Sequence, residues 1–584
     1  MIRLLSFFTV IVLFLSACST MPAPKSSRAH QALGVVSEEA NIVVCQPLTY
    51  SATCTVSTPA GKPVSTWLFG DILAGDTIYQ NGGVQFDKSG KITAVGCKTP
   101  SPEDLVISCP YQIVSPGTIN AHDHLSYNQN YPGGQNNNGG ASNPNYVLCN
   151  DPKQAYSNPV CATYRYDRRN EWRKGLEGKP MVVAPWGGTD ESKAWNELRH
   201  VMAGTTSIAG SGGQVGLARN PDRKNLMEGL VTVNDEEVDY DTFPLGDTSI
   251  VTGHDYGDCA YPNVAKPDVL DNLIFLPHVA EGINEFAHNE LECLTGSGSG
   301  SVKLQAPNST FIHAIAAIPS DSQLIKQSDM TLVWSPRSNI SLYGNTAQVT
   351  LYDTLGVRMA LSSDWTPSGS INLFREMSCA YDYNRNYLNE HFSKQDLWRM
   401  ITVNAARALG ISDQVGTIAI GQWADLAVYN AIGKGYTSYY DPFINGNVED
   451  VSLVLRGGIP LYGISDLVMS LDSSCETIPT SVCGTKKAVC VKETGFDFAQ
   501  IAAANTDAYP LYYCGTPFNE PSCVPARYQE YSGTITSADQ DGDGIMNNAD
   551  NCPSIFNPVR PMDNGKQADS NHNGIGDACD QNPL

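Results

Sequence analysis

Short apolar runs alternate with helical patterns across a long central region, about residues 114–412. Runs such as 205–209, 273–278, 330–335 and 357–362 have the length of strands, and helical patterns lie between them. This alternation indicates βα units built around a parallel sheet, and the length of the region suits a barrel of eight units. The sequence therefore predicts an α/β fold with a (β/α)₈ barrel.

Two histidines separated by one residue follow the first apolar run. His122 and His124 come shortly after a Ser-Pro-Gly-Thr segment, residues 115–118, so they lie close to a turn where a pocket could open. Side chains alternate along a strand, so both imidazoles would point to the same side and reach one metal ion. The spacing therefore predicts part of a metal site.

Further candidate ligands follow in order along the chain. His278, His313 and Asp364 each come at or just after the end of an apolar run, and Glu281 follows His278 by three residues. The carboxyl ends of barrel strands carry the active sites of this architecture. An isolated buried His or Asp is more often a hydrogen-bonded core group than a ligand. The ordered set nevertheless favours a metal-dependent enzyme.

The ordered set resembles that of the metal-dependent amidohydrolase superfamily, in the branch that holds cytosine deaminase and imidazolonepropionase. The resemblance covers roughly residues 65–465 and extends to the segments 197–206, 335–342, 402–410 and 416–428. It implies a (β/α)₈ TIM barrel beside a small β-sandwich, which would be formed from two segments that flank the barrel.

The resemblance also implies roles for the candidate residues. His122, His124, His278 and Asp364 would bind one divalent metal, Zn²⁺ or Fe²⁺. Asp364 would accept a proton from the activated water, Glu281 would carry protons to the leaving nitrogen, and His313 would orient the water or polarise the substrate.

Some members of the superfamily hold two metals, bridged by a carboxylated lysine from the fourth barrel strand. None of the lysines between His124 and His278 ends a clear apolar run, which predicts a single-metal site; they are Lys153, Lys174, Lys179, Lys193, Lys224 and Lys266. His200 lies in a helical pattern and His254 in a Gly-rich loop, and both are interpreted as structural.

The substrate is only weakly specified. The long insertion 128–179 is expected at the mouth of the barrel, and the arginines of its segment 164–173 could bind an anionic substrate. A solvated helix face is the favoured interpretation of these arginines. Trp365 could form the floor of a pocket for a planar ring, or it could be a packing residue.

The first residues predict the location of the chain. Residues 1–18 combine Arg3, an apolar stretch and the segment Leu15-Ser-Ala-Cys18, which resembles a lipobox with Cys18 as the lipidated residue. This predicts a lipoprotein anchored to a membrane, most plausibly the outer membrane of a Gram-negative bacterium. The alternative is an ordinary secretory signal with a chance cysteine.

Cysteine usage agrees with export. The chain has 17 cysteines, and 16 remain when Cys18 is set aside. Their close spacing favours disulfides in an oxidising compartment, although the pairing cannot be read from the sequence. Zinc-binding cysteines are the alternative, and the absence of any CxxC pair disfavours it. The neighbouring pairs are Cys45 and Cys54, Cys97 and Cys109, Cys149 and Cys161, Cys483 and Cys490, Cys514 and Cys523, and Cys552 and Cys579.

Acidic residues predominate, and they are dense at the C-terminus. The net charge of −23 argues against a nucleic-acid partner. The segment 536–584 has a spacing of Asp, Asn and Gly that resembles thrombospondin type 3 repeats, which bind Ca²⁺ with little regular structure. A disordered acidic tail is the alternative. The expected Ca²⁺ ligands are Asp539, Asp541, Asp543 and Asp550 in a first loop and Asp569, Asn571, Asn573 and Asp580 in a second.

The sequence thus divides into six parts and leaves three hypotheses of function. The first is a lipid-anchored metal-dependent hydrolase acting on a C–N bond of a small molecule, the second an inactive amidohydrolase-like surface protein with a calcium-dependent binding role, and the third a purely structural calcium-binding protein. The first is preferred. Neither the substrate nor the oligomeric state follows from the sequence. The predicted parts are a signal peptide (1–18), a tether (19–62), a composite β-sandwich (63–113 and 413–465), the barrel (114–412), a Cys-rich connector (466–535) and the calcium repeats (536–584).

Overall fold

The computed structural model describes residues 41–46, 53–135, 142–232, 236–246 and 259–584. Cys18 and His254 lie outside these ranges, as do the whole predicted signal peptide and most of the predicted tether. No helix within the described ranges has both the length and the apolar character needed to cross a bilayer.

Eight parallel segments pair into a ring at the centre of the molecule. Strands β7 and β8 pair with each other, and β9 to β13 pair in sequence order. The extended segment 219–221 joins β8 to β9, and a parallel bridge between Asp123 and Asp364 closes the ring. The predicted barrel is therefore confirmed. Its strands are β7 (Thr118–Asn120), β8 (Thr205–Ile208), β9 (Val238–Asp241), β10 (Ile274–Val279), β11 (Thr310–His313), β12 (Thr331–Trp334) and β13 (Arg358–Leu361).

Side chains that alternate in direction along the barrel strands belong to two separate hydrophobic cores. Leu276, Ile312, Val333 and Ala360 belong to one buried cluster, whereas their neighbours along the same strands pack in another cluster with the surrounding helices. Because successive side chains point to opposite faces, the first cluster fills the barrel interior. Helix α11 joins this interior cluster and contacts β7, β12 and β13, so it closes the end of the barrel opposite the site.

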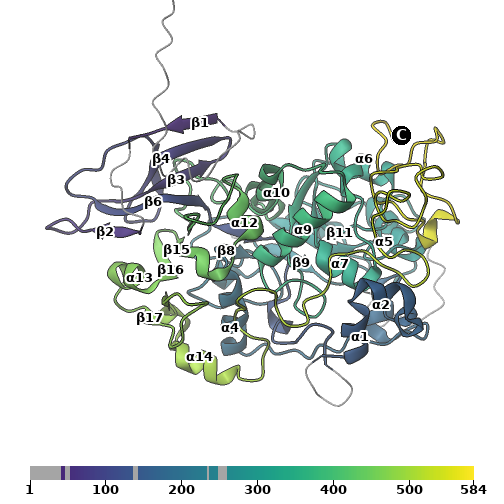
Figure 1. Cartoon of the computed structure of the whole chain (residues 1–584), viewed down its shortest axis with the longest axis horizontal. Coiled ribbons are helices and arrows are strands. Elements are labelled where there is room, and N and C mark those ends of the chain that lie inside the picture. Colours follow the sequence, from purple (N-terminus) through teal and green to yellow (C-terminus); the bar gives the residue numbers. More distant parts are fainter. Residues whose placement is uncertain (1–40, 47–52, 136–141, 233–235, 247–258) are drawn as a thin grey trace, which may run out of the picture.

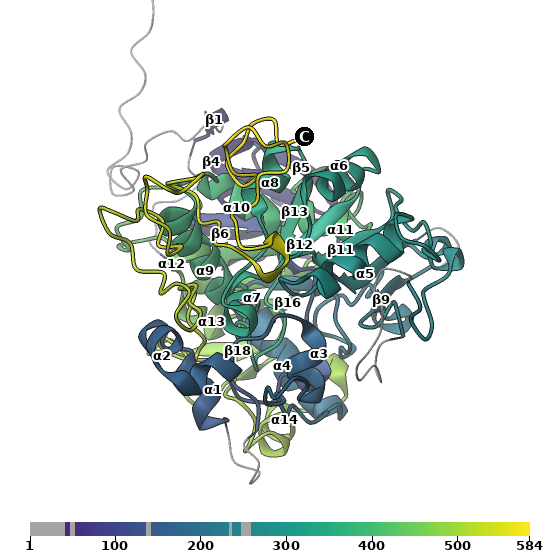
Figure 2. The same cartoon turned by 90° about the vertical axis from the view of Figure 1, so that its right-hand side faces the viewer.

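Helices surround the ring and also form much of its mouth (Figures 1 and 2). Several begin with a side-chain cap, for example at Thr189, Asn284 and Asn372. The helices are α1 (Pro144–Cys149), α2 (Pro152–Ser157), α3 (Arg169–Lys174), α4 (Asp190–Val201), α5 (Glu285–Thr295), α6 (Pro319–Gln327), α7 (Pro336–Tyr343), α8 (Val349–Thr354), α9 (Leu373–Tyr387), α10 (Lys394–Met400), α11 (Val403–Ala408), α12 (Asp441–Asn445), α13 (Ser465–Leu471) and α14 (Phe498–Ala504).

The segments that flank the barrel join into one sheet of eleven strands. Strand β6 precedes the barrel and pairs antiparallel with β14, which follows it. The sheet extends beyond the predicted boundaries, because β1 and β2 lie in the predicted tether and β17 and β18 in the predicted connector. The strands are β1 (Asn41–Val44), β2 (Thr55–Ser57), β3 (Thr66–Ala74), β4 (Thr77–Phe86), β5 (Ile92–Gly96), β6 (Leu105–Pro116), β14 (Leu426–Tyr429), β15 (Val451–Arg456), β16 (Ile459–Ile464), β17 (Glu476–Thr477) and β18 (Lys487–Val489).

The C-terminal segment is irregular, as predicted. All of residues 536–584 are described, and they contain one short 3-10 helix, Pro561–Asp563, but no α-helix or strand. The segment lies against the barrel near α6 in both views, where it is coloured yellow (Figures 1 and 2).

The 16 described cysteines form eight disulfides, and only two of the neighbouring pairs singled out in the sequence are bonded to each other. For the other four pairs, closeness along the chain does not predict the partner. In the composite sheet, for example, the strands bring Cys45 to Cys97 and Cys54 to Cys109. A Cys45–Cys54 hairpin is thus wrong. The disulfides are Cys45–Cys97, Cys54–Cys109, Cys149–Cys161, Cys259–Cys293, Cys379–Cys523, Cys475–Cys490, Cys483–Cys514 and Cys552–Cys579.

Candidate metal centre

The two histidines of the HxH motif lie just beyond a strand. Strand β7 ends at Asn120, so His122 and His124 occupy the turn that follows it, and the expectation that both sit on the strand is wrong. Their rings nevertheless converge. The Nε2 atoms of His122 and His124 lie 3.1 and 3.4 Å from Oδ1 of Asp364. The turn after β7 and the turn after β13 thus face each other across the closing bridge.

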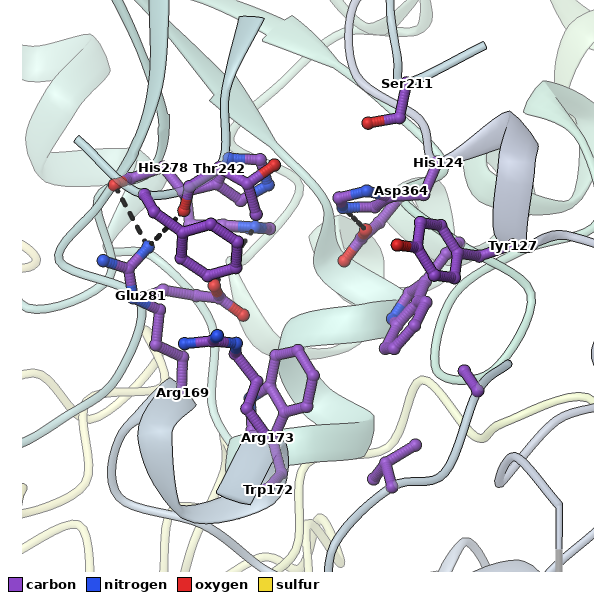
Figure 3. Close-up of a pocket in the computed structure, with 15 residues that line it drawn as sticks. His124, Tyr127, Arg169, Trp172, Arg173, Ser211, Thr242, His278, Glu281 and Asp364 are labelled. Atoms are coloured by element: carbon purple, nitrogen blue, oxygen red, sulfur yellow. Dashed lines mark hydrogen bonds and ion pairs between the residues drawn. The ribbon is translucent and has the colours of Figure 1, made fainter. Parts of the chain in front are cut away.

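His278 and His313 line the same pocket, and Figure 3 shows His278 there with His124 and Asp364. Ligand atoms of His122, His124 and His278 lie within 4.8 Å of one another, as do those of His122, His313 and Asp364. The structure therefore brings together all five residues that the sequence singled out as metal ligands or as their companion histidine. Three imidazoles and one carboxylate form a donor set that suits Zn²⁺ or Fe²⁺.

Unsatisfied nitrogen atoms support a cation site. The Nε2 atoms of His122 and His278 are buried, and neither makes a hydrogen bond to a described residue. Nδ1 of His278 lies 3.2 Å from the carbonyl oxygen of Asp241, which orients the ring so that Nε2 faces the other histidines. Buried polar atoms are normally paired, so two such nitrogens beside Asp364 fit a bound metal.

Burial keeps the histidines of the site uncharged. Removal from water lowers the pKa of His122 to about 3, of His124 to about 4 and of His313 to about 3, and that of His278 lies well below its ordinary value. A neutral imidazole offers the lone pair that a metal requires. The four rings are thus in the ligand form at neutral pH.

Two site residues adopt a backbone conformation that favours glycine. His313 has a φ of 70° and Asp364 a φ of 55°, both in the left-handed region. This backbone conformation costs free energy for residues other than glycine, so it persists only where the surrounding structure stabilises it. Here the strand-end turns aim both side chains at the same point, which is consistent with a functional constraint.

Asp123, between the two histidines, holds the turn in place through hydrogen bonds. Its carboxylate accepts hydrogen bonds from Asn120, Asn128 and Ser363 at 2.6–2.9 Å, and Nε2 of His200 lies 3.2 Å away. His200 is thus structural, as expected, but it supports the metal turn. Asp123 was not predicted as a site residue, although its position between the two histidines of the motif is a signal that could have found it.

Tyr240 is the second site residue that was not predicted from the sequence. It comes from β9, which is the fourth segment of the ring, and its hydroxyl lies 2.9 Å from Nδ1 of His122 and donates to the carbonyl of Asp123 at 2.7 Å. This is the strand from which a bridging lysine would come in a two-metal site. A tyrosine in place of a lysine is consistent with the predicted single metal.

Glu281 and His313 face each other in the wall of the same pocket. Oε2 of Glu281 lies 3.9 Å from Nε2 of His313, and Tyr343 donates a hydrogen bond of 2.8 Å to the other carboxylate oxygen. Burial raises the pKa of Glu281 to about 8, and the charge of Asp364 adds to this rise. Asn339 lies 3.1 Å from Nδ1 of His313. Glu281 is therefore largely protonated at neutral pH.

The pocket above these residues has a volume of about 290 Å³. The predicted insertion forms one wall, which includes Arg169, Trp172 and Arg173 from α3. Arg169 is buried, donates to the carbonyl oxygen of Thr242 at 3.0 Å and pairs with Glu290 at 3.3 Å. The favoured interpretation of the segment as a solvated helix face is therefore wrong.

The ligands predicted for the first calcium loop also lie close together. Carboxylate oxygens of Asp539, Asp541 and Asp543 lie within 4.8 Å of one another, and all three side chains are buried. Burial and neighbouring carboxylates raise the pKa of Asp541 to about 8 and that of Asp543 to about 7. Gln567, missed in the sequence, donates to both Asp543 and Asp550.

The second predicted loop is held by hydrogen bonds of its own. The side-chain amides of Asn571 and Asn573 donate to Asp580 at 3.1 and 2.8 Å, and the carboxylate of Asp569 accepts from the backbone of Gly574 at 3.0 Å. The four residues predicted as ligands thus lie around one loop, with two amides where the first loop has carboxylates.

Comparison with known proteins identifies two families. The profile of the amidohydrolase family matches residues 280–462, and that of the thrombospondin type 3 repeat matches residues 535–560. The 5-methylthioadenosine/S-adenosylhomocysteine deaminase of Syntrophobacter fumaroxidans is 29% identical over 236 residues, which are 37% of this chain and 54% of the relative. The 5'-deoxyadenosine deaminase of Methanosphaera stadtmanae is 28% identical over 133 residues, 22% of this chain and 31% of the relative.

The chain thus spans about half the length of the first of these curated relatives. Among solved structures, atrazine chlorohydrolase from Arthrobacter aurescens has a TM-score of 0.47 at 16% identity, over 68% of this chain and 95% of the other. Guanine deaminase from C. acetobutylicum has a TM-score of 0.45 at 17% identity, over 68% and 99%. Residues 280–462 thus match the amidohydrolase family and residues 535–560 the thrombospondin type 3 repeat, and these matches support a metal-dependent amidohydrolase with a C-terminal repeat of this kind.

Removal of one imidazole should abolish tight metal binding. We expect the wild-type chain to bind one equivalent of Zn²⁺ or Fe²⁺, and His278→Gln to lose most of that affinity because a ligand is gone. Tyr240→Phe should weaken binding by about 10- to 100-fold, since it removes a contact that orients a ligand. Elemental analysis and competition with a chelator measure both.

The matched control is His391→Gln, because His391 lies at the surface and pairs with Asp353. It should bind metal like the wild type. Two equivalents per wild-type chain would contradict the single-metal prediction, and unchanged affinity in His278→Gln would contradict the ligand assignment.

Proposed function

We propose that this chain is an exported, lipid-anchored, metal-dependent hydrolase that acts on non-peptide C–N bonds of a small cyclic amide or amino-heterocycle. The observation that supports this proposal most is the convergence of three histidines and Asp364 in one pocket beside the buried Glu281. The relatives named above are deaminases, and such enzymes act on C–N bonds.

In this proposal, His122, His124, His278 and Asp364 hold one divalent cation. A cation held there would act as a Lewis acid and would lower the pKa of water to about 7, so that hydroxide is available at neutral pH. The neutral imidazoles suit this task because they are already in the ligand form, and Asp364 places a buried carboxylate oxygen beside them.

Proton transfer falls to two carboxyl groups. Asp364 directs Oδ1 at two imidazoles while Oδ2 accepts a hydrogen bond of 2.6 Å from Ser338, so it is positioned to take a proton from the attacking water. Glu281 is held by Tyr343 and keeps its proton near neutral pH, so it can donate that proton to the leaving nitrogen. His313 would polarise the substrate.

The shape of the pocket favours a flat substrate. Trp172 and Trp365 line it with ring centroids 5.5 Å apart, and Tyr127 and Phe243 complete an aromatic lining. Aromatic rings stack on planar heterocycles with a preference for offset or edge-to-face contacts. Arg173 from the insertion lies in the same lining and would supply hydrogen-bond donors to acceptor atoms of the substrate.

A screen for ammonia release or ring opening tests the hydrolase proposal. Aminopurines, aminopyrimidines, aminotriazines and cyclic amides are incubated with the zinc- or iron-loaded full chain, and we expect turnover of at least one class. Turnover by His122→Ala should fall to background because the cation loses a ligand, whereas His391→Gln should keep full activity. A metal-loaded wild-type chain without turnover in any class would favour an inactive, calcium-dependent surface protein.

The protonation state of Glu281 predicts a pH dependence. A group with a pKa of about 8 holds its proton below that pH and loses it above, so kcat should fall as the pH rises through about 8. Glu281→Gln cannot transfer a proton, and we expect kcat to fall by about 10²- to 10⁴-fold and to lose this limb. An alkaline limb that persists in Glu281→Gln would assign it to another group.

Export and lipid anchoring are proposed from the sequence of residues 1–18 and agree with the eight disulfides. In the bacterial host, Cys18→Ser should move the protein from the membrane fraction to a soluble exported fraction, measured by fractionation and immunoblotting. A Cys18→Ser protein that stays in the membrane fraction would rule out the lipid anchor.

A further inference from the structure

The calcium module is packed onto the barrel and is more than an appended tail. Phe556 is buried against Tyr383, Tyr387 and Tyr531, with ring centroids 5.3–6.3 Å apart. The backbone N–H of Phe556 donates to the carbonyl oxygen of Tyr387 at 2.8 Å. Helix α9 therefore carries a docking site for the first repeat.

The first calcium loop rests on a turn of the connector, residues 527–531. A Cβ atom at Gly542 would lie 2.8 Å from the carbonyl carbon of Gly533, and one at Gly544 would lie 2.6 Å from the carbonyl oxygen of Glu530. Both glycines also have positive φ angles. Such close backbone approach leaves little room for the loop to change shape without moving the turn.

The same turn supports the wall of the candidate active site. Arg527 is buried and donates to the carbonyl oxygens of Tyr166 at 3.1 Å and Tyr343 at 2.8 Å, and it pairs with Asp167 at 2.7 Å. The hydroxyl of Tyr343 in turn holds Glu281. A continuous set of contacts thus runs from the calcium loop to the proposed proton donor.

The carboxylates of the loop point to a cation site. Asp541 and Asp543 are 1% and 2% exposed, and they lie within 4.8 Å of Asp539. The Oδ2 atoms of Asp541 and Asp550 are buried without a hydrogen bond to any described residue. Like charges held together away from water destabilise the fold unless a cation neutralises them, and an all-oxygen set of this kind suits Ca²⁺.

We propose that Ca²⁺ binding by the loop 539–550 is a folding requirement of the barrel mouth, and that it holds the Arg527 turn and the Tyr343–Glu281 wall in place. Ca²⁺ in this loop then determines how well ordered the wall of the pocket is. The effect on catalysis rests on the function proposed above, but the effect on stability does not.

Calcium titration of the full chain tests this proposal by calorimetry and hydrogen exchange. At a hundredfold excess over the Kd, we expect the melting temperature to rise by about 2 °C. Exchange should slow in peptides that cover 539–550, 527–533 and 336–344. Asp541→Asn should lose both responses, whereas Asp382→Asn, a surface carboxylate on α9, should keep them.

Mg²⁺ at the same concentration is a second control on the wild-type chain, and it keeps the test decisive if Asp541→Asn does not fold. Mg²⁺ demands a smaller, more regular coordination shell, so it should give little protection. Calcium protection confined to the tail peptides would show an independent module and overturn the coupling. An unchanged melting temperature and unchanged exchange in Ca²⁺ would overturn the proposal entirely, whether or not the chain hydrolyses any substrate.

Discussion

The closing contact between Asp123 and Asp364 is the constraint on which the site depends. It joins the turn after the first barrel strand to the turn after the last, and so it completes the ring. Asp123 is fixed by Asn120 and Ser363, while Asp364 faces the two histidines of the motif. The contact that closes the ring therefore also brings together the two turns that carry His122, His124 and Asp364.

Much of the fold follows from local patterns, and what does not is physically understandable. The apolar runs at β10 to β13 fill the barrel interior, so their periodicity and order could be recognised from the sequence. Strand β9 could not, because it reads Val-Asp-Tyr-Asp and has no apolar run. Tyr240 was missed for this reason. The segment 219–221 pairs through only a few backbone contacts and leaves no pattern at all.

Long-range contacts explain the other differences. The arginines of the insertion look like a solvated helix face in the sequence, yet Arg165 and Arg169 are buried, where they contact carbonyl oxygens of distant residues and, for Arg169, the carboxylate of Glu290. Residues 526–527 of the connector supply part of this environment. Disulfide partners could not be read from the sequence for the same reason, since Cys379 bonds to Cys523, which lies 144 residues further along the chain. Partners of this kind are set by the tertiary fold and leave no local signal.

Strand β6 ends at Pro116, and the first barrel strand begins at Thr118. Only Gly117 separates the composite sheet from the barrel, and its Cβ position is occupied by the side chain of Thr206. The first connection between the sheet and the barrel therefore has no room to act as a hinge of the kind that opens two-lobed proteins. Entry of a substrate into the pocket then depends on the residues at its rim, which include Arg169, Trp172 and Arg173 of α3.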